Sequence, residues 1–178
     1  MTRTTEGARI SLGPVGEPDG WLRRFVGMTQ GDAVATLDRC KELLLAVTHW
    51  VPPLSEQPVS LDSWRAHTPK WFLDRCAPPL SPTEAEEEVR GWRSLDGAEK
   101  ARYEQERAWT FEDWVAWFDW SSDLRRSWLW WDSGTLDFDR FWIEVEIAEE
   151  PTALGTLLWM MRAAGAEIVA EDPEDSLR

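Results

Sequence analysis

The stretch SWLWWDSGTLDFDRFWIEVEI, residues 127–147, decides the expected fold. Its second half has an apolar residue at every second position, namely Phe141, Ile143, Val145 and Ile147. Such alternation predicts a β-strand with one buried and one solvent-facing side. The first half, SWLWWD, predicts a partner strand. Because Leu136 and Phe138 have even numbers, whereas the later apolar set has odd numbers, we expect a bulge or a loop end near Asp139 or Arg140.

Three tryptophans lie within four positions of the first expected strand. On a strand, Trp128 and Trp130 point to one side, while Leu129 and Trp131 point to the other. These side chains therefore do not all belong to the core of one layer. One side is expected to pack on helices, and the other is covered by a helix or loop or left as an apolar patch. Exposed aromatic patches usually mark binding sites.

The second expected strand carries acidic residues on its solvent-facing side, and Glu149 and Glu150 continue the negative charge beyond it. We expect a partner-binding surface here, made of Trp130, Trp131, Trp142, Glu144 and Glu146. Paired carboxylates beside an aromatic ring are also what glycoside hydrolysis uses. Alternating acids on any half-exposed strand give the same pattern, so we assign no catalytic residue.

The residues before this stretch are mostly helical in pattern. Residues 1–18 are rich in Gly and Pro and predict a flexible lead-in, and Trp21, Leu22, Phe25 and Val26 suggest one short helix. A long helix is expected over about 30–50, with Thr29 and Asp32 at its start and Cys40 on its apolar stripe.

Further helix starts follow along the chain. Two short helical pieces are expected before residue 80. Ser81, Pro82 and Glu84 form a capping-box pattern, and the helix they begin has an apolar stripe of Ala85, Val89 and Trp92. A polar helix over 98–107 and another that begins with Thr110 and Asp113 complete the helical part.

The C-terminal part predicts a β-β-α-β order. A helix over 152–164 ends at Gly165, and EIVAE follows as a strand. A right-handed crossover would set this last strand parallel to the second one. We therefore expect an α+β fold: one domain over 19–178, with a helical part over 19–122 packed on a small sheet over 123–172.

Composition limits the functional classes. The chain has 178 residues, a net charge of -14 and 14 tryptophans. An acidic chain without a Lys/Arg cluster is repelled by nucleic acid and by anionic membranes, so neither is an expected partner. No stretch approaches the ~20 apolar residues that cross a bilayer, and two cysteines are too few for a secreted disulfide framework. These features predict a cytoplasmic protein.

Patterns that hold metals or cofactors are weak. Nine helical steps place Cys40 and His49 on opposite faces of their helix, whereas zinc ligands must converge. Asp132, Asp137 and Asp139 lack the order of a calcium loop. The usual nucleotide, acyl-transfer and zinc-protease motifs are missing from the sequence, so we expect no cofactor and no metal. Cys40 is expected to be buried and reduced.

Several stretches, among them PKWFLDRCAP, GAEKARYEQERAWTFEDWVAWF and WLWWDS, resemble acidic, tryptophan-rich proteins of actinobacteria whose function is unknown. The resemblance covers roughly residues 64 to 170. It implies no activity, fold or site. It does agree with the amino-acid composition, because the chain has 16 arginines and only three lysines, which is a bias of GC-rich genomes.

Together these observations favour a non-enzymatic cytoplasmic protein that binds a basic protein partner with an acidic, aromatic surface. The narrower hypothesis is that the protein is an immunity- or antitoxin-like inhibitor. The alternative is a small-molecule or carbohydrate-binding domain, or a hydrolase, with Trp128, Trp130 or Trp142 as a stacking platform. A DNA mimic uses the same charge but needs carboxylates spaced like phosphates.

Overall fold

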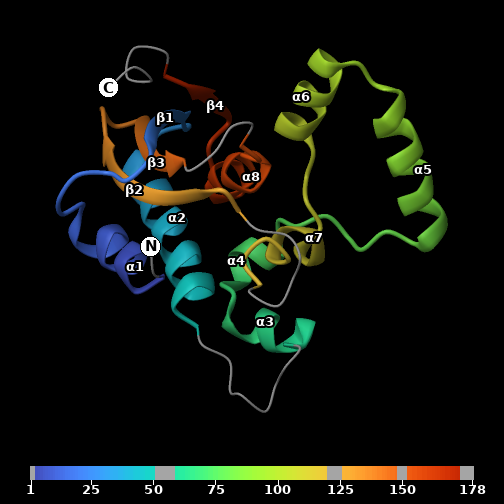
Figure 1. Ribbon diagram of the computed structural model, residues 1–178, viewed down its shortest axis with the longest axis horizontal. Helices are drawn as coiled ribbons and strands as arrows, with labels where there is room; N and C mark the ends of the chain where they lie inside the picture. Colours follow the sequence, from blue (N-terminus) through green and yellow to red (C-terminus); the bar gives the residue numbers. More distant parts are fainter. Residues whose placement is uncertain (1–2, 51–58, 120–125, 148–151, 173–178) are drawn as a thin grey trace.

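The chain has an α+β fold with helices mostly in its N-terminal part and an antiparallel sheet formed largely by later strands (Figure 1). The computed structural model describes residues 3–50, 59–119, 126–147 and 152–172. The helices in these residues are Arg3–Leu12 (α1), Ala33–His49 (α2), Leu61–His67 (α3), Lys70–Leu73 (α4), Pro82–Ser94 (α5), Gly97–Glu106 (α6), Phe111–Val115 (α7) and Gly155–Ala164 (α8). The strands are Trp21–Met28 (β1), Trp128–Thr135 (β2), Arg140–Ile147 (β3) and Ile168–Glu171 (β4).

The strand order is β2-β3-β1-β4, and all neighbours are antiparallel. The predicted strand pair is β2 and β3, with a loop end at Arg140 as expected and a bulge between Trp130 and Asp132. Because β3 and β4 are both antiparallel to β1, they run in the same direction, as predicted. They are not neighbours, however, since β1 lies between them. The β3–α8–β4 crossover therefore passes over one strand.

Residues 21–28 form the strand β1, so the expected short helix is wrong. The alternation of a strand is hidden here by two consecutive arginines. Arg23 lies on the same side of β1 as the buried Phe25, with its guanidinium 5.7 Å from the ring centroid, and it pairs with Glu171 of β4. An arginine thus occupies a position where the alternation of a strand would place an apolar side chain.

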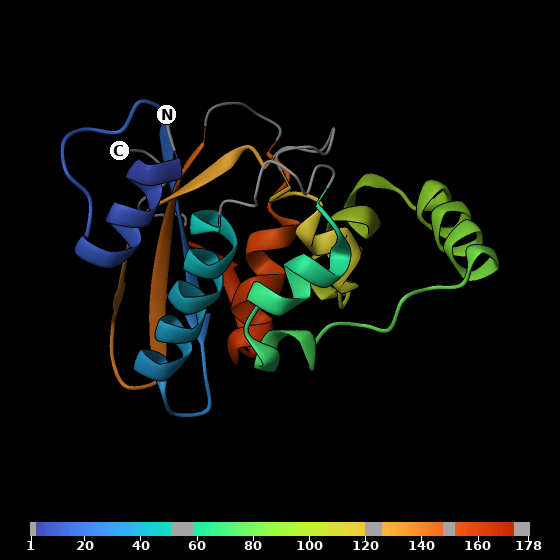
Figure 2. The ribbon, with the colours of Figure 1, turned by 90° about the horizontal axis from the view of Figure 1, so that it is seen from below.

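The core lies between the sheet and the helices α2 and α8, which cover one of its faces (Figure 2). The strands contribute fully buried side chains at alternate positions, namely Phe25, Phe141, Ile143, Val145 and Ile147. The helices oppose them with Leu43, Leu44, Leu157, Met160 and Met161. This is the buried side that the period-two pattern of residues 140–147 predicted.

An aromatic chain connects the sheet to the shorter helices. The rings of Phe72, Trp114, Phe118 and Trp128 follow one another with centroids 4.4 to 6.2 Å apart. Trp114 donates its indole N–H to the Thr156 carbonyl, and Trp128 donates to the Thr156 hydroxyl. Much of the tryptophan in this chain therefore belongs to packing, with the polar edge of two rings satisfied by one residue of α8.

Two predicted helix starts are confirmed by their capping hydrogen bonds, and a third is shifted. Helix α2 begins at Ala33 rather than near residue 30, because Asp32 rather than Thr29 is its N-cap and accepts from Ala35 N–H. Ser81 forms a reciprocal capping box with Glu84 at the start of α5, and Thr110 caps α7. These contacts lie within four residues of sequence, so local pattern is enough to predict them.

Helix α1 occupies part of the expected flexible lead-in. It packs against both α2 and β2, and Glu6 and Ile10 are buried. At Gly7 a Cβ atom would lie 1.4 Å from Nε2 of His49, so the two helices touch at a position without a side chain. Residues 3–12 are thus part of the fold.

Both cysteines are free, and Cys40 is completely buried on α2 as predicted. Burial raises the pKa of the Cys40 thiol well above its usual range and that of Cys76 to about 11. In the part of the chain that the structure describes, no helix is long and apolar enough to span a membrane.

Candidate functional site

Two of the three tryptophans of the predicted partner surface are buried. Trp130 is 0% exposed on the core side of β2, and Trp131, at the bulge, is 5% exposed. The Arg9 guanidinium of α1 lies 4.0 Å from the Trp131 ring centroid. The Trp130 backbone N–H donates to the Glu6 carboxylate. Helix α1 therefore covers the side of β2 that carries Trp131. This side is not an exposed aromatic patch, which was one of the two expected outcomes.

Glu144 and Glu146 are also buried, so the expected exposed acidic face is wrong. Glu146 accepts from Arg9 at 2.9 Å and from the backbone N–H groups of Asp19 and Gly20 at 2.8 and 3.0 Å. Glu144 pairs with Arg24. The reason is that α1 and the segment after it pack against these strands, which alternation along β3 alone does not reveal.

Of the five predicted residues, only Trp142 stays half-exposed, and it stacks against Arg24. The five residues therefore do not form one open surface. Their binding role stays a prediction, while Glu149 and Glu150 lie outside the described residues.

A second candidate surface is the helical arm formed by α5 and α6, which projects from the rest of the molecule (Figures 1 and 2). The base of this arm is closed where the Ala77 N–H donates to the Trp109 carbonyl at 2.9 Å. Each helix begins with a capping box, formed by Ser81 with Glu84 and by Asp96 with Glu99. Local hydrogen bonds thus define the arm, although no side chain of α5 is buried.

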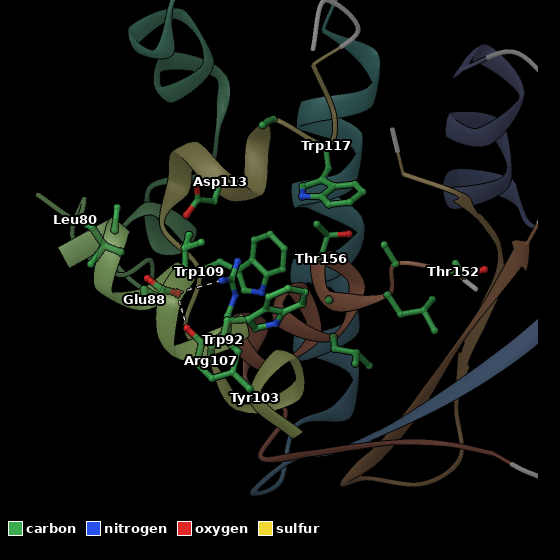
Figure 3. A pocket seen from close by; sticks show the side chains of 17 residues that line it. Leu80, Glu88, Trp92, Tyr103, Arg107, Trp109, Asp113, Trp117, Thr152 and Thr156 are labelled. Carbon is green, nitrogen blue, oxygen red and sulfur yellow. Dashed lines mark hydrogen bonds and ion pairs between the residues drawn. The ribbon is translucent and has the colours of Figure 1, made fainter. Parts of the chain in front are cut away.

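A cavity of about 760 Å³, here called the arm groove, lies between the arm and the helices α7 and α8. Figure 3 shows the arm residues Glu88 and Tyr103 on one side of it and Trp117, Thr152 and Thr156 on the other. The groove is lined by Leu80, Ala85, Glu88, Val89, Trp92, Tyr103, Arg107, Trp109, Asp113, Ala116, Trp117, Thr152, Ala153, Leu154, Gly155, Thr156 and Leu158. The lining is mostly apolar.

The apolar stripe predicted for residues 82–94 faces this groove. Val89 is 48% exposed and Trp92 is 39% exposed, although both lie on the side of α5 that lines the cavity. Across the groove, Trp117, Leu154 and Leu158 are only partly buried against the core. The sequence identified the stripe, but it did not identify what the stripe faces.

A polar cluster holds one side of the groove in place. The Glu88 carboxylate accepts from the Tyr103 hydroxyl and from Nη1 of Arg107, the latter at 3.2 Å. Burial, and then the neighbouring Glu88 carboxylate, raises the pKa of the Tyr103 phenol still further above neutral pH, which agrees with its role as the hydrogen-bond donor to Glu88. The Arg107 guanidinium also covers the Trp109 ring at 4.0 Å.

The charges around the groove are mainly negative. Glu88 and Arg107 pair with each other, whereas no group in the described residues pairs with the exposed carboxylate of Asp113. The helices α5 and α7 that line it also carry exposed acids, namely Glu84, Glu86, Glu87 and Glu112, and α5 carries the exposed Arg90 and Arg93 as well. The arm groove therefore combines apolar walls with Asp113 in its lining and with carboxylates on its flanking helices, here called the acidic rim.

Among the described residues, no three His, Cys, Asp or Glu side chains gather as metal ligands would. In the turn that holds Asp137 and Asp139, for which no calcium site was expected, Asp137 accepts from the backbone N–H and the guanidinium of Arg140, and this bonding lowers the pKa of Asp137 to about 2. Comparison with models of known protein families, with curated proteins and with solved structures finds no match to this chain.

Proposed function

We propose that the protein is a non-enzymatic interaction module that binds a basic protein partner through the acidic, aromatic surface of the arm. The observation that carries this proposal is α5, a helix of 13 residues with no buried side chain, a partly exposed apolar stripe and several exposed glutamates. Such a helix contributes little to the core. Apolar patches rimmed by charge are typical of sites where proteins associate.

Electrostatics supports a basic partner. The net charge is -14, and α5 adds a local concentration of carboxylates at residues 84–88. Complementary charge speeds encounter and disfavours acidic partners, while apolar anchors supply the affinity. This surface replaces the expected one on β2 and β3, where Glu144 and Glu146 are occupied by arginines of the same chain.

The narrower proposal is an immunity- or antitoxin-like inhibitor that acts in the cytoplasm. It is supported by the small size of the chain, by its charge and by two cysteines that form no disulfide bond. Such an inhibitor would mask a basic active surface rather than transform a substrate. A partner that is harmful when expressed alone and harmless when co-expressed with this protein is the expected outcome.

Affinity purification from the native cell at low and high salt tests the proposal. The wild type is expected to retain a basic protein that high salt releases, because exposed charge pairs are screened by salt. The variant with Glu86→Lys and Glu87→Lys is expected to lose it. The matched control carries the same charge change away from the arm, at Glu17→Lys and Asp38→Lys, and should retain it. Absence of any retained protein, or a retained acidic protein, contradicts the proposal.

A small-molecule or carbohydrate site is the second candidate function, and the volume of the arm groove favours it. About 760 Å³ lies in the range of ligand pockets, roughly 300–1,000 Å³. The expected platforms Trp128 and Trp130 are fully buried, so the stacking residues would instead be those of the groove. Thermal unfolding with a library of sugars and metabolites tests this function, because a specific ligand raises the unfolding temperature.

A further inference from the structure

We infer that the arm groove is the docking site of an amphipathic helix of the basic partner, with the apolar edge of that helix between α5 and α7 and its Lys or Arg side chains against the acidic rim. This inference rests on the proposed function and specifies the site and the shape of the partner. Its evidence is the combination of an open apolar groove with a carboxylate rim, which is described above.

The walls of the groove favour a helix over an extended segment. The groove lies between α5, α6, α7 and α8, and none of the described strands contributes to its lining. An extended segment would find no strand edge with which to pair its backbone N–H and C=O groups. A helix satisfies these groups internally and presents side chains at i, i+3, i+4 and i+7 to the groove. Since α5 spans 13 residues, or ~20 Å, a helix of similar length fits beside it.

Four residues are suited to hold such a helix. Val89 and Trp92 offer partly exposed apolar surface on the arm side, and Trp117 faces them from the body side. Tryptophan anchors commonly dominate the affinity of an interface. Asp113 offers the carboxylate at the rim that no group in the described residues neutralises, so it is the expected partner of a Lys or Arg.

Charge and ring contacts argue against the other occupants. A second copy of this chain also carries -14 and would place acidic α5 against an acidic rim. A stacked sugar needs an open aromatic face. Lys100 already lies over the Trp92 ring at 4.7 Å, and Arg107 lies over the Trp109 ring. A basic amphipathic helix does not require a second acidic copy of this chain. It also does not require the faces of the Trp92 and Trp109 rings, because it contacts the aliphatic side chains and the ring edges that line the groove.

A synthetic peptide of about 18 residues, long enough to form a helix, is the probe. It carries leucines along one helical edge and lysines elsewhere, with a fluorescent label for anisotropy. Two control peptides separate shape from charge: one has the same composition with the leucines dispersed, and one has glutamates in place of lysines. We expect the amphipathic basic peptide to bind the full-length protein roughly tenfold more tightly than the dispersed peptide and the acidic peptide not to bind.

Matched variants locate the site. Val89→Ser with Trp92→Ala is expected to weaken binding of the amphipathic peptide roughly tenfold, to the level of the dispersed peptide. Asp113→Asn should weaken it less. Val34 of α2 is also exposed and lies outside the groove, so Val34→Ser with Asp38→Asn should bind as the wild type does. Far-UV circular dichroism and urea unfolding verify that each variant is folded.

Each alternative outcome has a distinct meaning. If both basic peptides bind equally, or if the Val89 and Trp92 variant binds as the wild type does, the helix site is refuted while a charge-driven interaction module survives. If no basic peptide binds and the native cell yields no basic partner, both the inference and the proposed function fail. Concentration-dependent dimerisation that involves Trp92 identifies a second copy as the occupant and also refutes the inference.

Discussion

Arg9 of α1 donates from Nη1 to Oε2 of Glu146 on β3 at 2.9 Å, and each side chain is only 6% exposed. The two residues are 137 positions apart in the sequence. Glu6 of the same helix forms a second buried pair with Arg126, which lies just before β2, and Glu6 also accepts from the Trp130 backbone N–H. Two ion pairs thus attach the N-terminal helix to β3 and to the segment just before β2, and the first of them accounts for the burial of Glu146, which was expected to face solvent.

Removal of the charge at Glu146 is expected to destabilise the fold. Glu146→Gln removes the buried negative charge that accepts from Arg9 and from two backbone N–H groups, which should cost about 3 kcal/mol in the free energy of unfolding. Urea unfolding measures this loss. Lys70→Gln is the control, because its exposed ion pair with Asp74 should contribute less than about 1 kcal/mol. Equal stability of the two variants would show that the buried pair has no stabilising role.

Two glycines should respond to alanine in opposite ways. At Gly27 a Cβ atom would lie 2.5 Å from the ring of the fully buried Phe141, so Gly27→Ala is expected to cost about 1–3 kcal/mol. At Gly91 in α5 nothing lies within 4 Å of the added Cβ. Gly91→Ala should stabilise α5 by up to about 1 kcal/mol, seen as slower amide exchange in that helix. A stable Gly27→Ala protein would contradict the tight contact between β1 and β3.

Tryptophan substitutions should separate the core from the groove. Trp114 is completely buried and donates to Thr156, so Trp114→Ala is expected to cost about 3–5 kcal/mol. Trp92→Ala should change stability by only about 0.5 kcal/mol, because α5 has no buried side chain. Thermal or urea unfolding distinguishes them. A large loss with Trp92→Ala would mean that the arm is a structural element of the core.

The two cysteines should differ in reactivity toward a thiol reagent. Burial raises the pKa of Cys76 to about 11, so its thiol stays protonated at pH 8 and reacts slowly. Its rate should rise with pH toward 11, as the thiolate forms. Cys40 is completely buried and should react only after unfolding. In Cys76→Ser no labelling of the native protein is expected, and rapid labelling of that variant would show that Cys40 is accessible.

The sequence by itself determined the features that depend on neighbours in the chain. The capping contacts of Asp32, of Ser81 with Glu84 and of Thr110 join residues within a few positions, and the alternation along residues 140–147 marks a strand with one fully buried side. The α+β class follows from the order of these elements, and the apolar stripe of α5 follows from helical spacing.

Only the tertiary structure decided the environment of these elements. The sheet makes residues 21–28 a central strand, although consecutive arginines hide its alternation, and α1 turns the expected exposed face of β3 into a buried ion-pair network. The arm groove likewise depends on how α5 and α6 lie against α7 and α8. Contacts of this kind join residues that are far apart in the chain. Their energy depends on which surfaces pack together in the folded protein, and a local sequence pattern does not specify that packing.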